Sequence, residues 1–261
     1  MPIFQKKTMS VYTTKPLVTP KNPALVFSNS SGTDYTMLQA QIDALQKDFF
    51  LICYDTRGHG QSTAPNKSYT IAELGCDVVS LLEHLHIKKA HFCGISMGGL
   101  TGIWLSIHAP DKFDKIIVAN TAAKIGNQHA WQGRATSVQA NGLQPTADTA
   151  PSRWFSNGFI QNHPNIVKNL SDSLAKGDKD GYANCCQALA IADLRDELEN
   201  TKTPIIVITG EKDPVTTVAD GQFIVDNAPN ARLVTLNASH ISNIEQADKF
   251  TKAIKDFLTK T

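Results

Sequence analysis

The apolar residues of this 261-residue chain fall into short runs that alternate with amphipathic helical patterns. Short continuous apolar runs bounded by turn residues are typical of strands that are buried on both faces of a parallel sheet. Strands that alternate with helices predict an α/β protein with a mostly parallel, doubly wound sheet. The predicted strands cover residues 24–27, 49–54, 90–93, 116–119, 205–209 and 232–236.

Two helices are indicated most clearly. One begins at Thr70, which forms a capping-box pattern with Glu73, and its leucine and valine residues recur on one face. The other follows the third predicted strand, with apolar residues such as Leu100 and Ile107 at helical spacing. It is expected to end before Pro110, because proline cannot continue a helix.

The alternation of strands and helices is interrupted between residues 122 and 200. No strand pattern occurs there, and the composition turns toward Trp, Asn, Gln and helix-forming residues. Residues 145–151, with a proline at each end, are predicted to be a loop. We expect residues 122–200 to form a helical lid, inserted into a core made of residues 1–121 and 201–261.

Composition and charge narrow the class of protein further. The apolar fraction is 41%. The chain has 25 basic and 24 acidic residues, so its net charge of +1 provides no excess of positive charge for binding nucleic acid or an anionic membrane. No apolar stretch is typical of a secretory signal or a membrane span, so a soluble cytoplasmic protein is expected. The odd number of cysteines, 5, favours reduced thiols over a disulfide framework. The sequence leaves the oligomeric state open.

The most informative motif is Gly94-Ile95-Ser96-Met97-Gly98, placed between the third predicted strand and the helix after it. A serine on a sharp strand-to-helix turn needs small residues two positions away on each side, because the turn brings backbones together. This context predicts a nucleophile elbow, with Ser96 as the nucleophile.

A serine hydroxyl becomes a good nucleophile only when a histidine accepts its proton and a carboxylate orients that histidine. Asp213 and His240 are the predicted acid and base, since each follows a late strand at the sheet edge where Ser96 should emerge. Glu211, in the same loop as Asp213, remains an alternative acid. His59, in a loop at the same edge, remains a weaker alternative base.

The oxyanion of the expected intermediate needs two N–H donors. We assign one to the backbone of Met97, directly after the nucleophile, and the other to the backbone of Ser30, in the loop after the first predicted strand. Each donor is expected to contribute about 3 kcal/mol to transition-state stabilisation.

Cofactor and metal motifs give no further assignment. The sequence lacks a P-loop, a His-Glu-x-x-His motif and a complete dinucleotide loop, so no cofactor is expected. His84, His86 and His91 lie near a helix end and a strand start without a ligand spacing, so we expect no metal site.

With these residues in place, the chain resembles the α/β-hydrolase superfamily and, within it, the bacterial 3-oxoadipate enol-lactonases of aromatic catabolism. The resemblance extends from about residue 24 to about residue 245, and the lid segments are its most discriminating part. One departure is Ser31, where a larger apolar residue is expected. The segments that carry the resemblance are residues 26–34, 54–62, 92–102, 119–126 and 181–190, Trp131 with Arg134, and Arg153-Trp154-Phe155.

The resemblance implies hydrolysis of a five-membered enol lactone that carries a carboxylate, through an acyl-enzyme on Ser96. It also implies a small-molecule substrate bound by the lid residues Trp131, Arg134, Arg153 and Trp154. Arg134 is the first candidate partner for the substrate carboxylate, because it lies three residues after Trp131 on the same helical face. Arg153 and Lys124 are the alternatives.

Other functions remain open. A carboxylesterase or a carbon–carbon bond hydrolase of the same fold would use the same triad on another substrate. A dehalogenase or an epoxide hydrolase is disfavoured, because on this fold those reactions need a carboxylate at the position of Ser96. A ligand-sensing module without catalytic turnover is the alternative from another class.

Overall fold

One mixed sheet forms the centre of the protein. The structure is a computed structural model, and it describes residues 3–6, 9–13, 22–65 and 67–259. The order of the strands in the sheet is β1-β2-β4-β3-β5-β6-β7-β8. The strands are β1 (Ile3–Lys6), β2 (Met9–Thr13), β3 (Ala24–Ser28), β4 (Phe50–Tyr54), β5 (Ala90–Ile95), β6 (Phe113–Ala119), β7 (Ile205–Gly210) and β8 (Ala231–Leu236).

Strands β3 to β8 run parallel, whereas β1 and β2 pair antiparallel at one edge. Each predicted strand coincides with one of the parallel strands, and the α/β class with a mostly parallel, doubly wound sheet is confirmed. Every residue of β3, β4 and β5 is buried, which explains why their sequences are mostly apolar, with His91 in β5 and Ser28 at the end of β3 as exceptions. The strand order reverses at β3, and ligands of such sheets bind at the carboxyl ends of the strands near that point.

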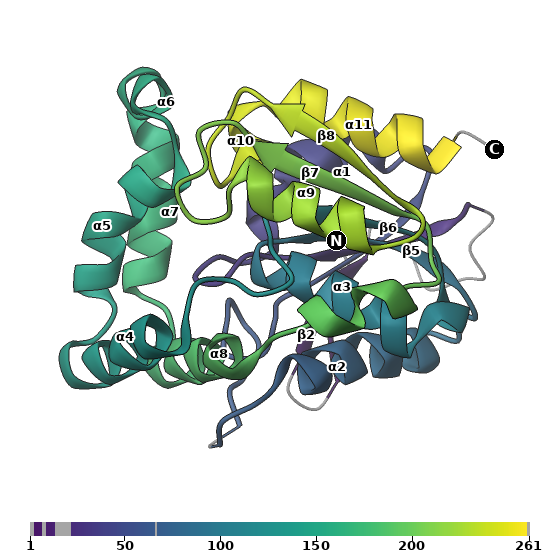
Figure 1. Cartoon of the computed structure of the whole chain (residues 1–261). Coiled ribbons are helices and arrows are strands. Elements are labelled where there is room, and N and C mark those ends of the chain that lie inside the picture. The colour runs from purple at the N-terminus through teal and green to yellow at the C-terminus, as the bar shows by residue number, and fades with distance from the viewer. Residues whose placement is uncertain (1–2, 7–8, 14–21, 66, 260–261) are drawn as a thin grey trace.

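Helices cover both faces of the sheet (Figure 1). Helix α2 has the predicted capping box between Thr70 and Glu73, and it packs on α3. Helices α1 and α11 contact each other on the opposite face. The helices of the core are α1 (Gln39–Leu45), α2 (Ile71–His84), α3 (Met97–His108), α9 (Val218–Asn227), α10 (Ser242–Glu245) and α11 (Ala247–Thr259), with the 3-10 turns η1 (Tyr35–Leu38), η2 (Pro110–Lys112) and η3 (Arg195–Asn200).

Between β6 and β7 the chain forms a group of helices, teal to green in Figure 1, beside the end of the sheet where β7 and β8 terminate. The two connections to this group lie together: the Leu194 amide donates to the Ala123 carbonyl at 2.9 Å, and Lys124 pairs with Asp193 at 3.0 Å. The helices are α4 (Gln128–Asn141), α5 (Gln144–Trp154), α6 (Asn157–Asn162), α7 (Pro164–Ala175) and α8 (Lys179–Ile191).

The predicted loop at residues 145–151 is wrong, because these residues lie inside α5. Pro145 is in the first turn, where a missing N–H costs no helical hydrogen bond. Pro151 lies in the helix interior, and α5 ends shortly after it, at Trp154. Two prolines are thus accommodated near the ends of one short helix.

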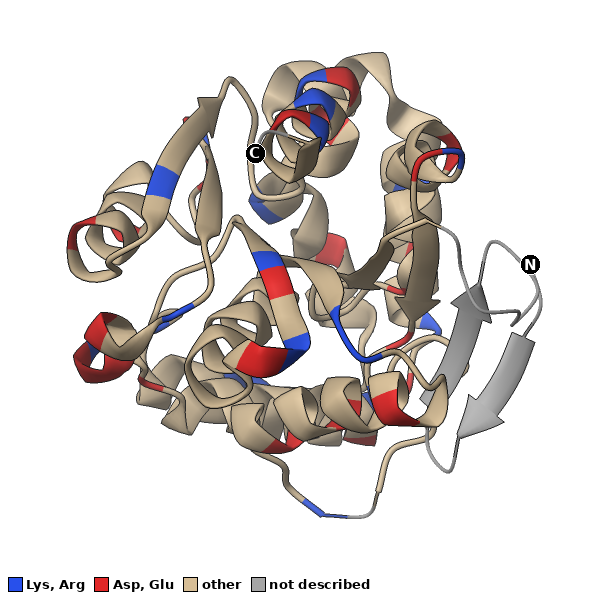
Figure 2. Cartoon of the chain, turned by 90° about the vertical axis from the view of Figure 1, so that its right-hand side faces the viewer, with Lys and Arg blue, Asp and Glu red and all other residues tan. Residues whose placement is uncertain are grey.

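Charged residues of both signs are interspersed along the ribbon in Figure 2, as the near-zero net charge suggests. Within the residues that the structure describes, none of the helices combines the length and the apolar character that crossing a bilayer requires. The cysteines are all unpaired, and only Cys76 is exposed.

Candidate active site

Ser96 occupies the turn between β5 and α3, where the chain changes direction sharply. Its backbone has φ 56° and ψ −114°, a conformation that residues other than glycine rarely adopt. A Cβ on Gly94 would lie 2.0 Å from the carbonyl oxygen of Gly98, and a Cβ on Gly98 would lie 2.7 Å from Ser28 Oγ. Glycine at both positions is therefore a steric requirement of the turn that presents Ser96.

Three side chains from distant parts of the sequence meet at the carboxyl edge of the sheet. Asp213 follows β7 and His240 follows β8. The Ser96 hydroxyl donates to His240 Nε2 at 3.0 Å, and His240 Nδ1 donates to Asp213 Oδ2 at 2.8 Å. An ionised carboxylate only accepts hydrogen bonds, so Nδ1 carries the proton and Nε2 is left to accept from Ser96. This is the geometry of a nucleophile, a base and an orienting acid.

Asp213 is buried among hydrogen-bond donors. Its Oδ1 accepts from the amides of Val215 and Thr216 at 2.8 and 3.0 Å, and its Oδ2 also accepts from Thr216 Oγ1 at 2.9 Å and from Asn120 Nδ2 at 3.0 Å. Burial opposes ionisation, but the hydrogen bond and charge of His240, together with the bonds from Thr216 and Asn120, hold the pKa of Asp213 below its ordinary value. Asp213 therefore stays charged at neutral pH.

The alternative acid and base lie elsewhere. Glu211 is exposed, whereas Asp213 is buried against His240. The imidazole of His59 is buried, and its Nε2 accepts from the Gly32 amide at 2.8 Å. Burial lowers the pKa of His59, which keeps this ring neutral and able to accept. His59 thus supports the loop after β3 and is not the base beside Ser96.

The two predicted oxyanion donors differ in their surroundings. Met97 is the first residue of α3, so its N–H has no acceptor within the helix. The Ser30 amide, in contrast, donates to the sulfur of Met37 at 3.4 Å. Within the described part of the chain, none of the hydrogen bonds uses the amide of Ser31, the next residue along the loop. We therefore move the expected second donor from Ser30 to Ser31.

Two residues that the sequence analysis missed directly follow β6. Asn120, which has a positive φ of 45°, donates both to Asp213 and to the Ser239 carbonyl, the latter at 3.1 Å. Thr121 Oγ1 donates to the Ser96 carbonyl at 2.8 Å. They fix the acid, the histidine loop and the elbow relative to one another. Their position at the end of a predicted parallel strand is the signal that sequence reasoning had available.

A cavity of about 230 Å³ opens in front of Ser96 and His240. All four predicted substrate-binding residues line it, whereas Asp213 lies behind His240 and Met97 is fully buried. The lining residues are Ser30, Ser31, Ser96, Ile125, Gly126, Ala130, Trp131, Arg134, Arg153, Trp154, Tyr182, Pro214, Val215 and His240.

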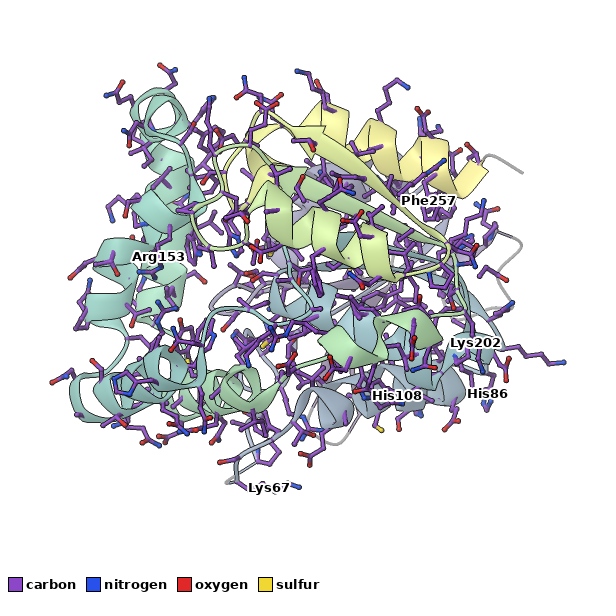
Figure 3. The ribbon with its side chains drawn as sticks, in the orientation of Figure 1. Lys67, His86, His108, Arg153, Lys202 and Phe257 are labelled. Carbon is purple, nitrogen blue, oxygen red and sulfur yellow. The ribbon has the colours of Figure 1, made fainter. Side chains whose placement is uncertain are left out.

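Arg134 on α4 and Arg153 on α5 both line this cavity, and Figure 3 labels Arg153 on the inserted helices. The Arg134 guanidinium lies 4.8 Å from the ring centroid of Trp131. Arg153 donates to Thr149 Oγ1 at 2.5 Å and to the Thr146 carbonyl at 3.2 Å. Burial and then the charge of Arg134 lower the pKa of Arg153. Among the described residues no carboxylate forms an ion pair with either arginine, since the arginine ion pairs are those of Arg57 and Arg195.

The third predicted cation is placed differently. Lys124 pairs with Asp193 at 3.0 Å, and it does not line the cavity. Trp131 is fixed by a hydrogen bond from its Nε1 to the Ile125 carbonyl at 2.6 Å, so the ring that stacks with Arg134 has a defined orientation. In the described ranges, no group of three or more His, Cys, Asp or Glu residues has a metal-binding arrangement.

Comparison with known proteins agrees with this architecture. Residues 27–247 match the family model of the alpha/beta hydrolase fold. The chain is 56% identical over 233 residues to 3-oxoadipate enol-lactonase 2 of Acinetobacter baylyi, an alignment that covers 89% of this chain and 87% of that protein. It is 45% identical over 254 residues to 3-oxoadipate enol-lactonase 1 of the same organism, with coverage of 97% and 94%.

A solved structure gives the same result. The enol-lactonase from Burkholderia xenovorans LB400 superposes with a TM-score of 0.94 and 40% sequence identity, over 99% of this chain and 100% of that one. The predicted resemblance is therefore confirmed along nearly the whole length. The chain belongs to the alpha/beta hydrolase fold family, in the group that contains the 3-oxoadipate enol-lactonases.

Proposed function

We propose that this protein hydrolyses 3-oxoadipate enol-lactone to 3-oxoadipate, in the β-ketoadipate route of aromatic catabolism, by a Ser-His-Asp triad through an acyl-enzyme. The main support is one cavity that holds both a nucleophile with its base and two guanidinium groups without a carboxylate partner among the described residues. An ester with an anionic side chain fits such a cavity, because its carbonyl can meet the nucleophile while its negative charge meets the guanidinium groups. The names of the relatives agree with this substrate.

The first chemical step opens the lactone ring. His240 Nε2 accepts the proton of Ser96, and Ser96 Oγ adds to the lactone carbonyl carbon. The carbonyl oxygen becomes an oxyanion, which the amides of Met97 and Ser31 stabilise by about 3 kcal/mol each. The carbon–oxygen bond of the ring then breaks, and its electron pair leaves with the ring oxygen as an enolate. An enolate is a better leaving group than an alkoxide, so proton donation from His240 is less demanding here.

The second step releases the product. The enolate stays attached through the acyl-enzyme, and its oxygen would close the ring again. Protonation of the enolate at carbon by His240 gives the ketone and removes that nucleophile. His240 then deprotonates a water, the resulting hydroxide adds to the ester carbonyl, and Ser96 leaves with a proton. The product is 3-oxoadipate.

We also propose that residues 122–200 act as a lid on a core of residues 1–121 and 201–261. Helices α4 and α5 supply Trp131, Arg134, Arg153 and Trp154 to the cavity wall, while the core supplies the triad. This division lets the lid determine which ester is accepted without changing the reacting groups. Arg134, stacked on Trp131, is the first partner for the substrate carboxylate, and Arg153 is the second.

The test compares the enol lactone with a neutral aryl ester. Ser96→Ala should abolish turnover of both substrates. Arg134→Ala and Arg153→Ala each remove a charge-assisted contact of about 1.5–3 kcal/mol, so kcat/KM for the lactone should fall by about 10- to 100-fold. The neutral ester should be nearly unaffected.

Lys124→Ala is the matched control, because its ammonium is paired with Asp193 outside the cavity. It should leave kcat/KM for the lactone within about threefold of the wild-type value. Equal losses on the lactone and the neutral ester in the arginine variants would contradict carboxylate recognition. Faster turnover of a ring-cleavage dienone than of the lactone would favour a carbon–carbon bond hydrolase.

A further inference from the structure

The inserted helices are hydrogen-bonded directly to the loop that carries His240. The amide of Ile241 donates to the carbonyl of Trp154 at 2.9 Å. Glu245, at the end of α10, accepts from the Ser239 amide at 3.0 Å and from the Ser156 amide at 3.2 Å, both on Oε2. The residues on both sides of the imidazole are therefore tied to the inserted segment.

The carboxylate of Glu245 makes the stronger part of this connection. Its Oε1 also accepts from the Ser156 hydroxyl. In the part of the chain that the structure describes, the ion pairs include no cation on Glu245. A partly buried carboxylate held only by N–H and O–H donors forms charge-assisted hydrogen bonds, which are about twice as strong as neutral ones. Glu245 thus joins the end of α5 to the histidine loop.

The same inserted segment also reaches the cavity. Arg153 and Trp154 line it, directly before Phe155 and Ser156 in the chain. A ligand that binds the Arg153 guanidinium therefore acts on a backbone segment that contacts Ile241 directly, through the Trp154 carbonyl, and Ser239 through Glu245. Only two residues, Trp154 and Phe155, separate the anion contact at Arg153 from the contact with Glu245 at Ser156.

We propose that Glu245 is a positioning residue that couples anion binding in the lid to the placement of His240. This inference rests on the proposed function, because it takes Arg153 as a contact for the substrate carboxylate. An anion at Arg153 fixes residues 153–156. The hydrogen bonds of Glu245 and of the Trp154 carbonyl then hold residues 239 and 241 in place. His240 Nε2 therefore stays in line with Ser96 Oγ during proton transfer. An ester without the carboxylate does not supply the constraint.

The experiment uses two aryl esters of equal chain length. 4-Nitrophenyl glutarate has a terminal carboxylate, and 4-nitrophenyl pentanoate does not. Wild-type, Glu245→Gln, Arg153→Ala and the double variant are compared by steady-state release of nitrophenolate. Glu211→Gln, a change at an exposed carboxylate that does not contact Glu245 or His240 in the described structure, is the matched control. Thermal unfolding verifies that each variant is folded.

In Glu245→Gln, kcat for the glutarate ester should fall about tenfold with little change in KM, while kcat for the pentanoate ester should change less than about threefold. Arg153→Ala should raise KM for the glutarate ester and, because the bound anion no longer fixes residues 153–156, should also lower kcat for that ester. The two substitutions should be non-additive in kcat by at least about threefold, because they interrupt one path. Glu211→Gln should match the wild type on both esters.

Equal kcat losses on the two esters, or additive effects in the double variant, would reduce Glu245 to a structural role and overturn the proposal. The absence of a wild-type preference for the glutarate ester would overturn it as well. Wild-type turnover of the esters without turnover of the enol lactone would reject only the proposed substrate. If Glu245→Gln does not fold, Ser156→Ala removes one bond on the lid side and should lower kcat selectively for the glutarate ester.

Discussion

Asp213→Asn replaces one carboxylate oxygen by an NH₂ group in a site that contains only donors. Oδ1 accepts from the Val215 and Thr216 amides at 2.8 and 3.0 Å. Oδ2 accepts from His240 Nδ1 at 2.8 Å, Thr216 Oγ1 at 2.9 Å and Asn120 Nδ2 at 3.0 Å. The new NH₂ group therefore opposes a donor in either orientation.

The two orientations differ in cost. An NH₂ group at the Oδ1 position opposes two backbone N–H groups, which cannot rotate. At the Oδ2 position it opposes one fixed donor, Asn120, because the Thr216 hydroxyl can turn to accept and His240 can change tautomer. Each buried donor left without an acceptor costs about 1–3 kcal/mol, so the second orientation is favoured. The introduced NH₂ group would then donate to His240 Nδ1, and the imidazole proton would move to Nε2.

An imidazole that carries its proton on Nε2 points a donor at Ser96 and cannot accept the hydroxyl proton. Such a tautomer change in a Ser-His-Asp triad lowers kcat by about 10⁴-fold, which corresponds to about 5.5 kcal/mol in the barrier. We expect a loss of that size for Asp213→Asn. The free energy of unfolding should fall as well, by about 1–3 kcal/mol for the opposed Asn120 donor.

The assay follows the decrease of enol-lactone absorbance under saturating substrate, with urea unfolding for stability. Glu211→Gln serves as the control, since this exposed carboxylate lies in the same loop and does not contact His240 in the described structure. A loss of less than about tenfold in a folded Asp213→Asn protein would refute the tautomer argument. It would mean that His240 keeps its orientation without an ionised acceptor at Nδ1.

Three further predictions follow from the same geometry. Gly94→Ala places a Cβ 2.0 Å from the Gly98 carbonyl oxygen, so the free energy of unfolding measured by urea titration should drop by about 3 kcal/mol or more. A drop of less than about 1 kcal/mol would contradict the elbow geometry. Burial lowers the pKa of His59 from 6.5, so the unfolded chain binds a proton first as the pH falls, and the free energy of unfolding should decrease below about pH 6.5. Urea midpoints measured against pH should show this decrease, and the same decrease in His59→Gln would assign it to another group. Ser31→Ala keeps the backbone amide and should leave kcat within about threefold, whereas a loss of about 100-fold would assign the oxyanion contact to the hydroxyl.

The sheet could be predicted from the sequence because its strands are buried on both faces. Residues of β3, β4 and β5 have no exposed side, so these strands are mostly apolar and easy to recognise. The edge strand β8 was found as well, although most of its residues are only partly buried. Strands β1 and β2 were missed, since antiparallel strands at an edge lack this mostly apolar pattern.

The triad could be proposed from the sequence because two constraints act together. The elbow requires Gly94 and Gly98 around Ser96, and the parallel topology sends the residues after β7 and β8 to the same edge. The supporting residues could not be found in this way. The position of Asn120 after a predicted strand places it at the sheet edge, but no spacing rule links Asn120 or Thr216 to Asp213, and only the three-dimensional structure reveals these hydrogen bonds.

The oxyanion loop illustrates a different limit. Sequence reasoning placed the second donor at Ser30, but the orientation of an individual amide depends on acceptors that the sequence does not reveal. Met37 accepts from Ser30 and His59 accepts from Gly32, and neither partner is adjacent in the sequence. The Ser31 amide between them donates to no acceptor within the described structure, which is why the expected donor moves by one residue.

The two cavity arginines are an unfavourable arrangement for the empty protein. Arg134 and burial both disfavour the charge of Arg153, which makes only hydrogen bonds to Thr146 and Thr149 within the described structure. Arg134 and Arg153 are partly buried, and like charges that are partly removed from water lower stability unless a counter-charge is supplied. Stacking on Trp131 offsets part of this cost for Arg134 alone. A fold that keeps both cations beside a serine nucleophile is therefore better explained by an anionic ester in the cavity than by the stability of the lid.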